Sequence, residues 1–351
     1  MRPAKSSGTA QASRGAVTRR AFAAGALALP ALLRHASAQA TTIRLGKQYG
    51  LPFLPQMVME QHKLIERHAG RQGIPSLSVQ WLTMSGPGAL NDALLSGQME
   101  FVNVAAPSLG TLWDKTFATP LQVHGLCAVQ SMPYVLCTRN AAVNTIADFT
   151  ANDRIAVPTV KISGQALALQ MAAARLWGPD HYERLDALTV SMAHPDAMQA
   201  LIGGRSEITA HFASSPFHYY ELAVPGIRQV LKSYDTLGGK HTNGIQVATR
   251  QFYDANPRLC AAVLRAHNEA NAFIDAQPRE AAQIYLSLTG DKRNSLDDLA
   301  RMVADPDVEY TTTPAKVMTL IAFMHRAGRI KRLPGSWQEL FFPDVHDVKG
   351  S

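Results

Sequence analysis

Apolar segments with the length of strands alternate with amphipathic segments through most of the chain. In the first part, the expected strands are residues 42–46, 77–81 and 101–105, and the expected helices are residues 53–68, 89–96 and a segment that starts after residue 110. Strands and helices that alternate in this way indicate an α/β fold with a largely parallel sheet.

A second set of the same kind follows two apolar strands that are close together in sequence. Those two strands are expected over 121–128 and 133–138, and a short helix over 144–149. The second set has expected strands over 154–157, 188–192 and 208–212, and expected helices over 165–177, 196–202 and 216–222. Two such sets predict two lobes, each with its own sheet and core.

The last part of the chain is predicted to return to the first lobe and then to become helical. Strands are expected over 230–234 and 245–248, and helices over 257–276, 279–288, 295–304, 314–327 and 336–342. We therefore predict an export segment over 1–40, the first part of lobe I over 41–138, lobe II over 139–232, and a return to lobe I with C-terminal helices over 233–351.

The first forty residues have the pattern of an export signal. Arg19 and Arg20 form a twin-arginine pair, an apolar run follows, and small residues at 36–38 or 38–40 offer a cleavage site. We expect export to the periplasm by the twin-arginine route; a general secretory signal is the alternative. The segment holds six of the 34 basic residues, so 28 basic residues face 27 acidic ones in the remainder. This balance predicts no nucleic-acid partner.

The three cysteines, Cys127, Cys137 and Cys260, have no CxxC spacing. A zinc cluster or a disulfide scaffold is therefore not expected. Buried thiols are the expectation, and a single bridge between Cys127 and Cys137 is the alternative if their strands are neighbours.

The segment from Arg154 to Arg175 indicates where a ligand would bind. It has the pattern of a strand, a polar loop and a helix, so the free N–H groups of the helix start would suit a small anion or polar ligand. An ordinary loop in which Ser163 caps the helix is the alternative. The same arrangement recurs at 83–88, 106–110, 193–195 and 213–215. Ligands collect at the carboxyl ends of strands in open α/β sheets.

Several short motifs, in their order along the chain, resemble one family. They are the glycine turn and helix of 86–101 and the segments 113–115, 145–149, 154–158, 190–197, 210–217 and 337–343. In this order they resemble the substrate-binding proteins of ABC importers of the nitrate, sulfonate and taurine type, over nearly all of the chain after residue 40. The resemblance implies a two-lobed periplasmic-binding-protein fold of type II. Each lobe would be a mixed, mostly parallel sheet flanked by helices, with two crossing strands as a hinge.

The resemblance also implies a function and its partners. The protein would be a monomeric, non-enzymatic solute-binding component of an ABC importer in the periplasm. It would close on a small-molecule anion of the sulfonate, nitrate or carboxylate class and deliver it to a permease and its ATPase at the inner membrane. No cofactor, metal or catalytic residue is expected.

The candidate ligand-binding residues lie in the loops at the strand ends of both lobes, where the helix starts are predicted. In lobe I they are Gln48, Tyr49, Leu51, Ser85, Gly86, Ala106, Pro107 and Ser108. In lobe II they are Lys161, Ser163, Gly164, Gln165, His194, His211, Ala213 and Ser214.

Two alternatives to a transport receptor stay open. The first is an enzyme on the same fold, a lyase or a metal-dependent synthase, which would use His194 or His211. The loops of lobe II offer no paired carboxylate, and the sequence has no P-loop, dinucleotide fingerprint or Ser-His-Asp spacing to support catalysis. The second is a receptor that presents its ligand to a partner other than a permease.

Overall fold

A computed structural model of the chain describes residues 40–351. The export signal predicted over residues 1–40 lies outside the described residues, apart from Ala40. Among the described residues, no helix is both long and apolar enough to cross a membrane.

The first sheet has five strands in the order β2-β1-β3-β10-β4. β1 runs parallel to β2 and β3, and β10 runs antiparallel to β3 and β4. The bounds are β1 Thr42–Lys47, β2 Ser78–Thr83, β3 Phe101–Val104, β4 Val123–Ser131 and β10 Thr242–Thr249. This sheet forms lobe I, and its strand positions confirm the sequence pattern in this part of the chain.

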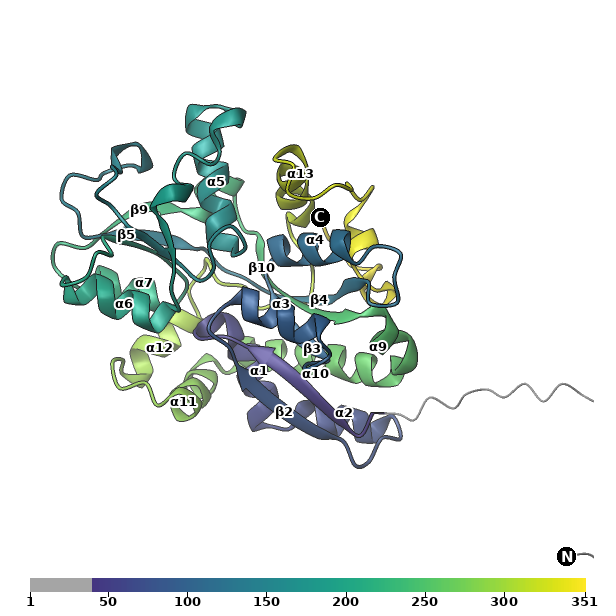
Figure 1. Cartoon of the computed structure of the whole chain (residues 1–351). Coiled ribbons are helices and arrows are strands. Elements are labelled where there is room, and N and C mark those ends of the chain that lie inside the picture. The colour runs from purple at the N-terminus through teal and green to yellow at the C-terminus, as the bar shows by residue number, and fades with distance from the viewer. Residues whose placement is uncertain (1–39) are drawn as a thin grey trace, which may run out of the picture. The chain divides into compact units, whose positions relative to one another are not determined.

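The second sheet also has five strands, in the order β7-β6-β8-β5-β9. β6 runs parallel to β7 and β8, and β5 runs antiparallel to β8 and β9. The bounds are β5 Val135–Thr138, β6 Ile155–Val157, β7 Thr189–Ser191, β8 Ala210–Ala213 and β9 Arg228–Lys232. In Figure 1, β5 and β9 lie beside α5, away from β2 and β3.

The chain changes sheets earlier than the sequence pattern indicated. β4 ends at Ser131 in the first sheet and β5 begins at Val135 in the second, so the crossing falls at 132–134 and not at the expected lobe boundary of residue 138. The two apolar strands follow each other without a strong turn signal, and the sequence therefore did not mark the crossing.

Most helices of the first lobe cover its sheet. Their bounds are α1 Leu54–Gln61, α2 Leu64–Arg71, α3 Pro87–Leu95, α4 Ala106–Lys115, α9 Arg250–Ala255, α10 Pro257–Ala276, α11 Pro278–Thr289, α12 Leu296–Val303 and α13 Val317–Arg326. The single helix predicted over 53–68 is wrong, because Lys63 adopts a positive φ of 50° and separates α1 from α2. The helix predicted over 336–342 is a 3-10 turn, Trp337–Leu340.

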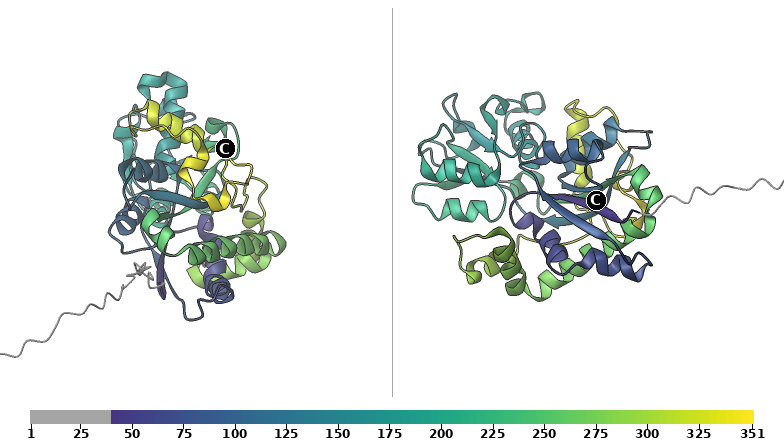
Figure 2. Two further views of the ribbon diagram at one scale, coloured as in Figure 1. Left: turned by 90° about the vertical axis from the view of Figure 1, so that its right-hand side faces the viewer. Right: turned by 60° about the horizontal axis from the view of Figure 1, so that its bottom comes forward.

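The helices of the second lobe are α5 Gly164–Trp177, α6 His194–Gly203 and α7 Phe217–Leu222. A short helix, α8 Ser233–Leu237, leads from β9 back to the first sheet. In the right-hand view of Figure 2 the teal segments of lobe II gather on one side, and the purple strands and helices of lobe I on the other.

The two crossings between the sheets are bonded to each other. The backbone N–H of Ser233 donates to the carbonyl oxygen of Tyr134 at 2.9 Å, and the N–H of Tyr134 donates to Oγ of Ser233 at 2.9 Å. These paired segments are where a rotation between the lobes would have to occur, because only they connect β4 to β5 and β9 to β10.

All three cysteines are free and buried. Cys127 lies in β4 of the first sheet and Cys137 in β5 of the second, so the bridge considered from the sequence is not formed. Burial raises the pKa of all three thiols.

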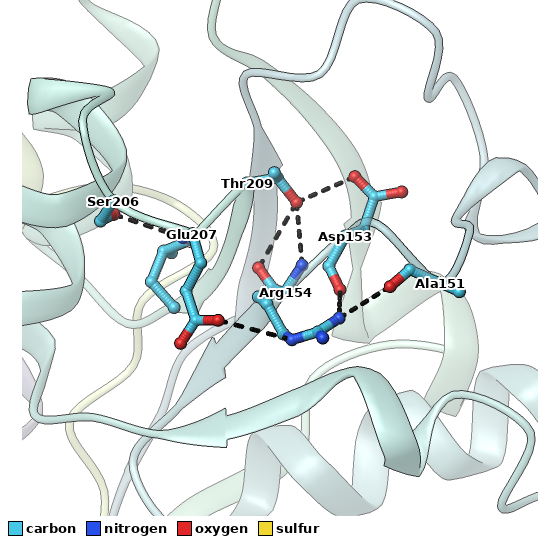
Figure 3. A network of polar contacts seen from close by, with 7 residues as sticks. Ala151, Asp153, Arg154, Ser206, Glu207 and Thr209 are labelled. Atoms are coloured by element: carbon cyan, nitrogen blue, oxygen red, sulfur yellow. Dashed lines mark hydrogen bonds and ion pairs between the residues drawn. The ribbon is translucent and has the colours of Figure 1, made fainter.

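A polar network fixes the amino-terminal ends of β6 and β8 (Figure 3). Oγ1 of Thr209 donates to Asp153 at 2.9 Å and accepts from the backbone N–H of Arg154 at 3.1 Å. The Arg154 guanidinium donates to the carbonyl oxygens of Ala151 and Asp153 and pairs with Glu207 at 3.7 Å. The two parallel strands are thus anchored at one end, and their opposite, carboxyl ends carry the loops that face lobe I.

Candidate functional site

A small cavity of about 40 Å³ lies where the carboxyl strand ends of both lobes meet. Lobe I contributes the loop after β1, with Gln48 and Tyr49, and lobe II contributes the loop after β6, with Ser163 and Gly164. The crossing residue Tyr134 also lines the cavity. The site is therefore built from both sheets and from the segment that connects them.

Four helices begin at this cavity. Its lining includes Pro87 at the start of α3, Ala105 before α4, Gly164 at the start of α5 and His194 at the start of α6. The first N–H groups of a helix have no partner within it, and the helix dipole adds a partial positive charge at this end. Four such ends around one small volume favour a negatively charged occupant.

The polar side chains of the lining are amides, hydroxyls and the imidazole of His194. The amides are Gln48, Asn103, Gln130, Gln165 and Asn243. Within the described residues, no Lys, Arg, Asp or Glu side chain lines this cavity. An anion here would be held by neutral donors and helix ends, without an ion pair.

Two buried amide oxygens of the lining lack a hydrogen-bond partner. They are Oε1 of Gln130 and Oδ1 of Asn243, and both residues are almost fully buried. An unsatisfied buried polar group is costly. Because an amide can present either its oxygen or its NH₂ group, both side chains can supply donors or acceptors to an occupant.

Gln165, His194 and Ser214 form a hydrogen-bonded cluster at the lobe II wall. Nε2 of Gln165 lies 3.0 Å from Oγ of Ser214 and 3.2 Å from Nε2 of His194, and Ser214 Oγ lies 3.2 Å from the same ring nitrogen. Phe217 stacks on the His194 ring at a centroid distance of 5.3 Å. The cluster therefore presents a fixed polar surface to the cavity.

His194 continues into a chain of buried groups. Its Nδ1 lies 2.8 Å from Nε2 of His211, whose Nδ1 lies 2.5 Å from Oε1 of Glu221. His211 and Glu221 are fully buried. Burial, followed by the repulsion that His211 and His218 would exert when protonated, holds the pKa of His194 well below its ordinary value.

A second, larger cavity of about 530 Å³ adjoins the first, since Gln48 and Tyr49 line both. Its lining combines aromatic side chains with charged ones, namely Trp81, Tyr220 and Tyr285 with Lys47, Glu60, Asp291 and Arg293. A ligand whose polar group occupies the small cavity therefore has space for a further portion beside it.

Solved structures show where this architecture occurs. The alkanesulfonate-binding protein of Xanthomonas axonopodis pv. citri, bound to MOPS, has a TM-score of 0.65 at 19% identity, over 85% of this chain and 96% of that chain. A protein of Bordetella bronchiseptica has a TM-score of 0.69 at 16% identity, over 87% of this chain and 95% of that one. The periplasmic nitrate-binding protein of Synechocystis has a TM-score of 0.63 at 17% identity, over 86% of this chain and 84% of that one.

This chain has the periplasmic-binding-protein fold. The fold class predicted from the sequence is thereby confirmed. No protein-family model matches the chain, and no curated protein matches it by sequence.

Seven of the sequence-predicted site residues line the interlobe cavity of this fold. They are Gln48, Tyr49, Ser163, Gly164, Gln165, His194 and Ser214. Ser163 also accepts a hydrogen bond from the Ala166 N–H, so it caps α5 as the alternative interpretation expected. Whether these residues contact a ligand stays a prediction.

Other predicted residues stand next to the cavity without lining it. Gly86 packs closely against Pro158 of the opposite lobe, and Leu51 is buried with its N–H bonded to the Ser215 carbonyl oxygen. His211 lies behind His194. Ala213 is part of the lobe II core.

The remaining candidates do not line the cavity. Ser85 is exposed, and Ala106, Pro107 and Ser108 lie buried in the first turn of α4, which begins directly after β3 and not after a loop. Ser108 accepts a hydrogen bond from Asn91.

Lys161 also does not line the cavity. Its backbone has a positive φ of 62° and its ammonium group lies 3.9 Å from Glu183 and 3.8 Å from Asp186. The one cation among the sequence-predicted site residues therefore pairs with acidic groups of its own lobe.

Four polar lining residues were missed in the sequence because they do not lie in helix-start loops. Asn103 and Gln130 lie within the strands β3 and β4, Asn243 lies in β10, and Tyr134 lies at the crossing. The available signal was a polar side chain inside an otherwise apolar strand, since such a residue must find a partner when buried.

The two histidines do not make a metal site with their neighbours. Across residues 40–351, no group of three or more His, Cys, Asp or Glu side chains is placed to hold a metal ion. His194 and His211 instead direct ring nitrogens at each other.

Proposed function

We propose that this protein is the solute-binding component of an ABC importer and binds a small anion of the sulfonate, nitrate or carboxylate class. The observation that carries the proposal is the meeting of four helix starts at one uncharged cavity between two lobes. Neutral donors and helix ends are a well-suited environment for an anion that must also be released.

The space of the adjoining cavity, which aromatic as well as charged side chains line, favours an organic anion within this class. Gln48 and Tyr49 line both this cavity and the smaller interlobe cavity, so the two cavities are neighbours. An ion as small as nitrate would leave this volume unused, whereas an alkyl or aryl group would remove apolar surface from water there.

The contacts between the lobes support a mechanism of closure on the ligand. The N–H of Leu51 in lobe I donates to the carbonyl oxygen of Ser215 in lobe II at 2.9 Å. The hydroxyl group of Tyr219 in lobe II donates to Asp305 in lobe I at 2.5 Å. A ligand that contacts both walls would stabilise this closed arrangement relative to an open one.

The partners and location follow from this role. We infer a monomer in the periplasm, exported through the predicted twin-arginine signal, that presents its closed form to an inner-membrane permease and its ATPase. The fold, and its presence in periplasmic nitrate-binding and alkanesulfonate-binding proteins, supports this inference. The protein would bind its solute without converting it.

A thermal-shift screen tests the proposal. The protein is unfolded and refolded to remove any bound solute, and then mixed with sulfonates, carboxylates, nitrate and neutral analogues of the same size. We expect the melting temperature to rise with concentration for at least one anion, because only the folded form binds. Stabilisation by neutral solutes alone would contradict the anion class. Mass spectrometry of the solute that copurifies with the untreated protein would identify it.

A further inference from the structure

A line of buried hydrogen bonds leads from the cavity into lobe II. Ser214 and Gln165 line the cavity and contact Nε2 of His194. His194 contacts His211 through its other ring nitrogen, and His211 contacts Glu221. We call the last three residues the His194–His211–Glu221 chain. It ends in a carboxyl group that water does not reach.

The number of protons in this chain decides the direction of each hydrogen bond. When both rings are neutral and Glu221 is ionised, the carboxylate accepts from Nδ1 of His211. Nε2 of His211 then accepts from Nδ1 of His194. The edge of His194 that lies at the cavity, Nε2, has no proton in this form. It must accept a hydrogen bond from the Ser214 hydroxyl group or from the Gln165 amide.

One additional proton reverses this order. Whether that proton resides on Glu221 or on His211, Nε2 of His211 becomes a donor to Nδ1 of His194. His194 then carries its own proton on Nε2 and donates to Ser214. The Ser214 hydroxyl is left free to donate into the cavity.

The two forms differ in their affinity for an anion. The deprotonated chain holds one uncompensated negative charge away from water and turns acceptors toward the cavity. The protonated chain has no net charge and turns a donor toward the cavity. An anion therefore favours the protonated form.

We propose that an anion bound in the cavity is coupled to one proton taken from water by the His194–His211–Glu221 chain, which makes Ser214 a donor to the ligand. This inference rests on the proposed function and deepens it. The site would select oxyanions that have no donor groups of their own, such as sulfonates. His211 and Glu221 are positioning residues, since they act through His194.

The neighbouring titratable groups stay uncharged at neutral pH. Burial, together with the charge of Glu221, raises the pKa of Cys137, which faces the chain from β5. Burial lowers the pKa of His218, on α7, to about 4. α5 contributes Gln165, and Phe217 covers the His194 ring. The change in charge is thereby confined to the chain itself.

Calorimetric titration with ethanesulfonate, a monoanion at every pH used, tests the coupling. In the unaltered protein, titrated over a series of pH values, we expect the association constant to fall as pH rises, by up to about tenfold per pH unit for one coupled proton. In Glu221→Gln the chain loses its ionisable carboxyl group, so it carries no net charge with either orientation of the amide. This variant should bind with an association constant that changes less than about twofold over the same range.

His218→Gln is the matched control, because it removes a buried imidazole beside the chain without entering it. It should keep the pH dependence of the unaltered protein. A pH-independent affinity in the unaltered protein, or an unchanged pH dependence in Glu221→Gln, would overturn the coupling. If only His218→Gln loses the pH dependence, the coupled proton belongs to His218 and not to the His194–His211–Glu221 chain. That result would also overturn the coupling.

Nitrogen-15 NMR of the histidine rings provides a second readout that does not depend on affinity. His194 should carry its proton on Nε2 in the protonated form of the chain and on Nδ1 in the deprotonated form, and in Glu221→Gln the position of this proton should not change with pH. A proton on Nδ1 of His194 at every pH overturns the inference even when an anion binds. A different outcome is that the proton of His194 changes nitrogen with pH but the protein binds no anion. That outcome contradicts the proposed function and therefore also the coupling that rests on it.

Discussion

The backbone N–H of Leu51 donates a 2.9 Å hydrogen bond to the carbonyl oxygen of Ser215 and so joins the two lobes directly beside the cavity. Gly50, which precedes Leu51, has a positive φ of 105°, and a Cβ on it would lie 2.7 Å from the same carbonyl oxygen. The close approach of the lobes thus depends on a glycine. We therefore expect substitutions at the lobe contacts to alter ligand affinity.

Gly86→Ala tests this dependence on close approach. A Cβ at Gly86 would lie 2.8 Å from the carbonyl oxygen of Pro158 and 2.8 Å from Oγ1 of Thr159, both in the opposite lobe. The φ of Gly86 is −172°, which any residue adopts, so the lobe itself is not strained. We expect anion affinity to fall by about tenfold or more, because the closed form is destabilised.

Gly70→Ala is the control for that substitution. A Cβ at Gly70, on α2, would meet open space. The variant should bind as the unaltered protein does and unfold at a slightly higher temperature, since alanine favours a helix over glycine by about 1 kcal/mol. Equal affinity of both variants, measured by calorimetry, would show that the lobes do not close on the ligand.

Tyr219→Phe and Tyr220→Phe remove two contacts between α7 and lobe I. The hydroxyl groups of Tyr219 and Tyr220 donate to Asp305 and Asp291. A hydrogen bond to a charged group contributes about 1.5–3 kcal/mol, so the double variant should open more readily and bind at least about tenfold more weakly.

Tyr253→Phe is the matched control for the two tyrosine variants. Its hydroxyl donates to Asp344 within lobe I, and its loss should leave affinity unchanged. Small-angle scattering of the ligand-free proteins should show a larger radius of gyration only for the double variant. The same radius in all three proteins would argue against these contacts as a latch.

Gln165→Met and Lys161→Ala separate two sources of anion affinity. Gln165 lines the cavity and bonds to Ser214, whereas Lys161 pairs with Glu183 and Asp186. We expect Gln165→Met to weaken anion binding by about tenfold, and Lys161→Ala to change it by less than about twofold. The opposite order, in calorimetric titrations, would mean that the lysine supplies the charge for the ligand.

Acid should destabilise the protein through its buried histidines. Burial lowers the pKa of His124, His218 and His241 to about 4 and that of His267 to about 3, from 6.5. At pH values between the ordinary pKa of 6.5 and the lowered pKa values of the folded protein, the unfolded chain binds more protons than the folded one. The free energy of unfolding therefore decreases as pH falls through this range. Each group contributes up to about 1.4 kcal/mol per pH unit.

Urea unfolding at a series of pH values measures this dependence. His267→Gln should reduce the slope by about one proton, because His267 is fully buried and bonded to Gln246. His62→Gln, at an exposed position, should leave the slope unchanged. A slope that His267→Gln does not alter would assign the acid sensitivity to other groups.

The sequence predicted the sheets well because the strands are short apolar runs bounded by turn residues. It did not locate the change of sheet between Ser131 and Val135, because strand pairing is a long-range property that local pattern does not contain. The break at Lys63 was missed for a related reason. A lysine in a helical pattern gives no local sign that its φ will be positive.

The candidate site was predicted in part. Residues at helix starts, such as Ser163 and His194, were found because helix ends have recognisable signals. Gln130 and Asn243 were not found, because their position at the cavity depends on how the two lobes meet. Lys161 was selected for its charge, but the direction of a loop side chain is decided by its neighbours in space, here Glu183 and Asp186.

The measurement that tests the central claim most directly is a pair of calorimetric titrations of the refolded protein, one with ethanesulfonate and one with ethanesulfonamide. The two solutes have nearly the same size, and only the first is an anion at neutral pH. The convergence of four helix starts on an uncharged cavity predicts that the sulfonate binds at least about tenfold more tightly than the sulfonamide. Equal affinities, or tighter binding of the neutral sulfonamide, would contradict the claim that this cavity is an anion site.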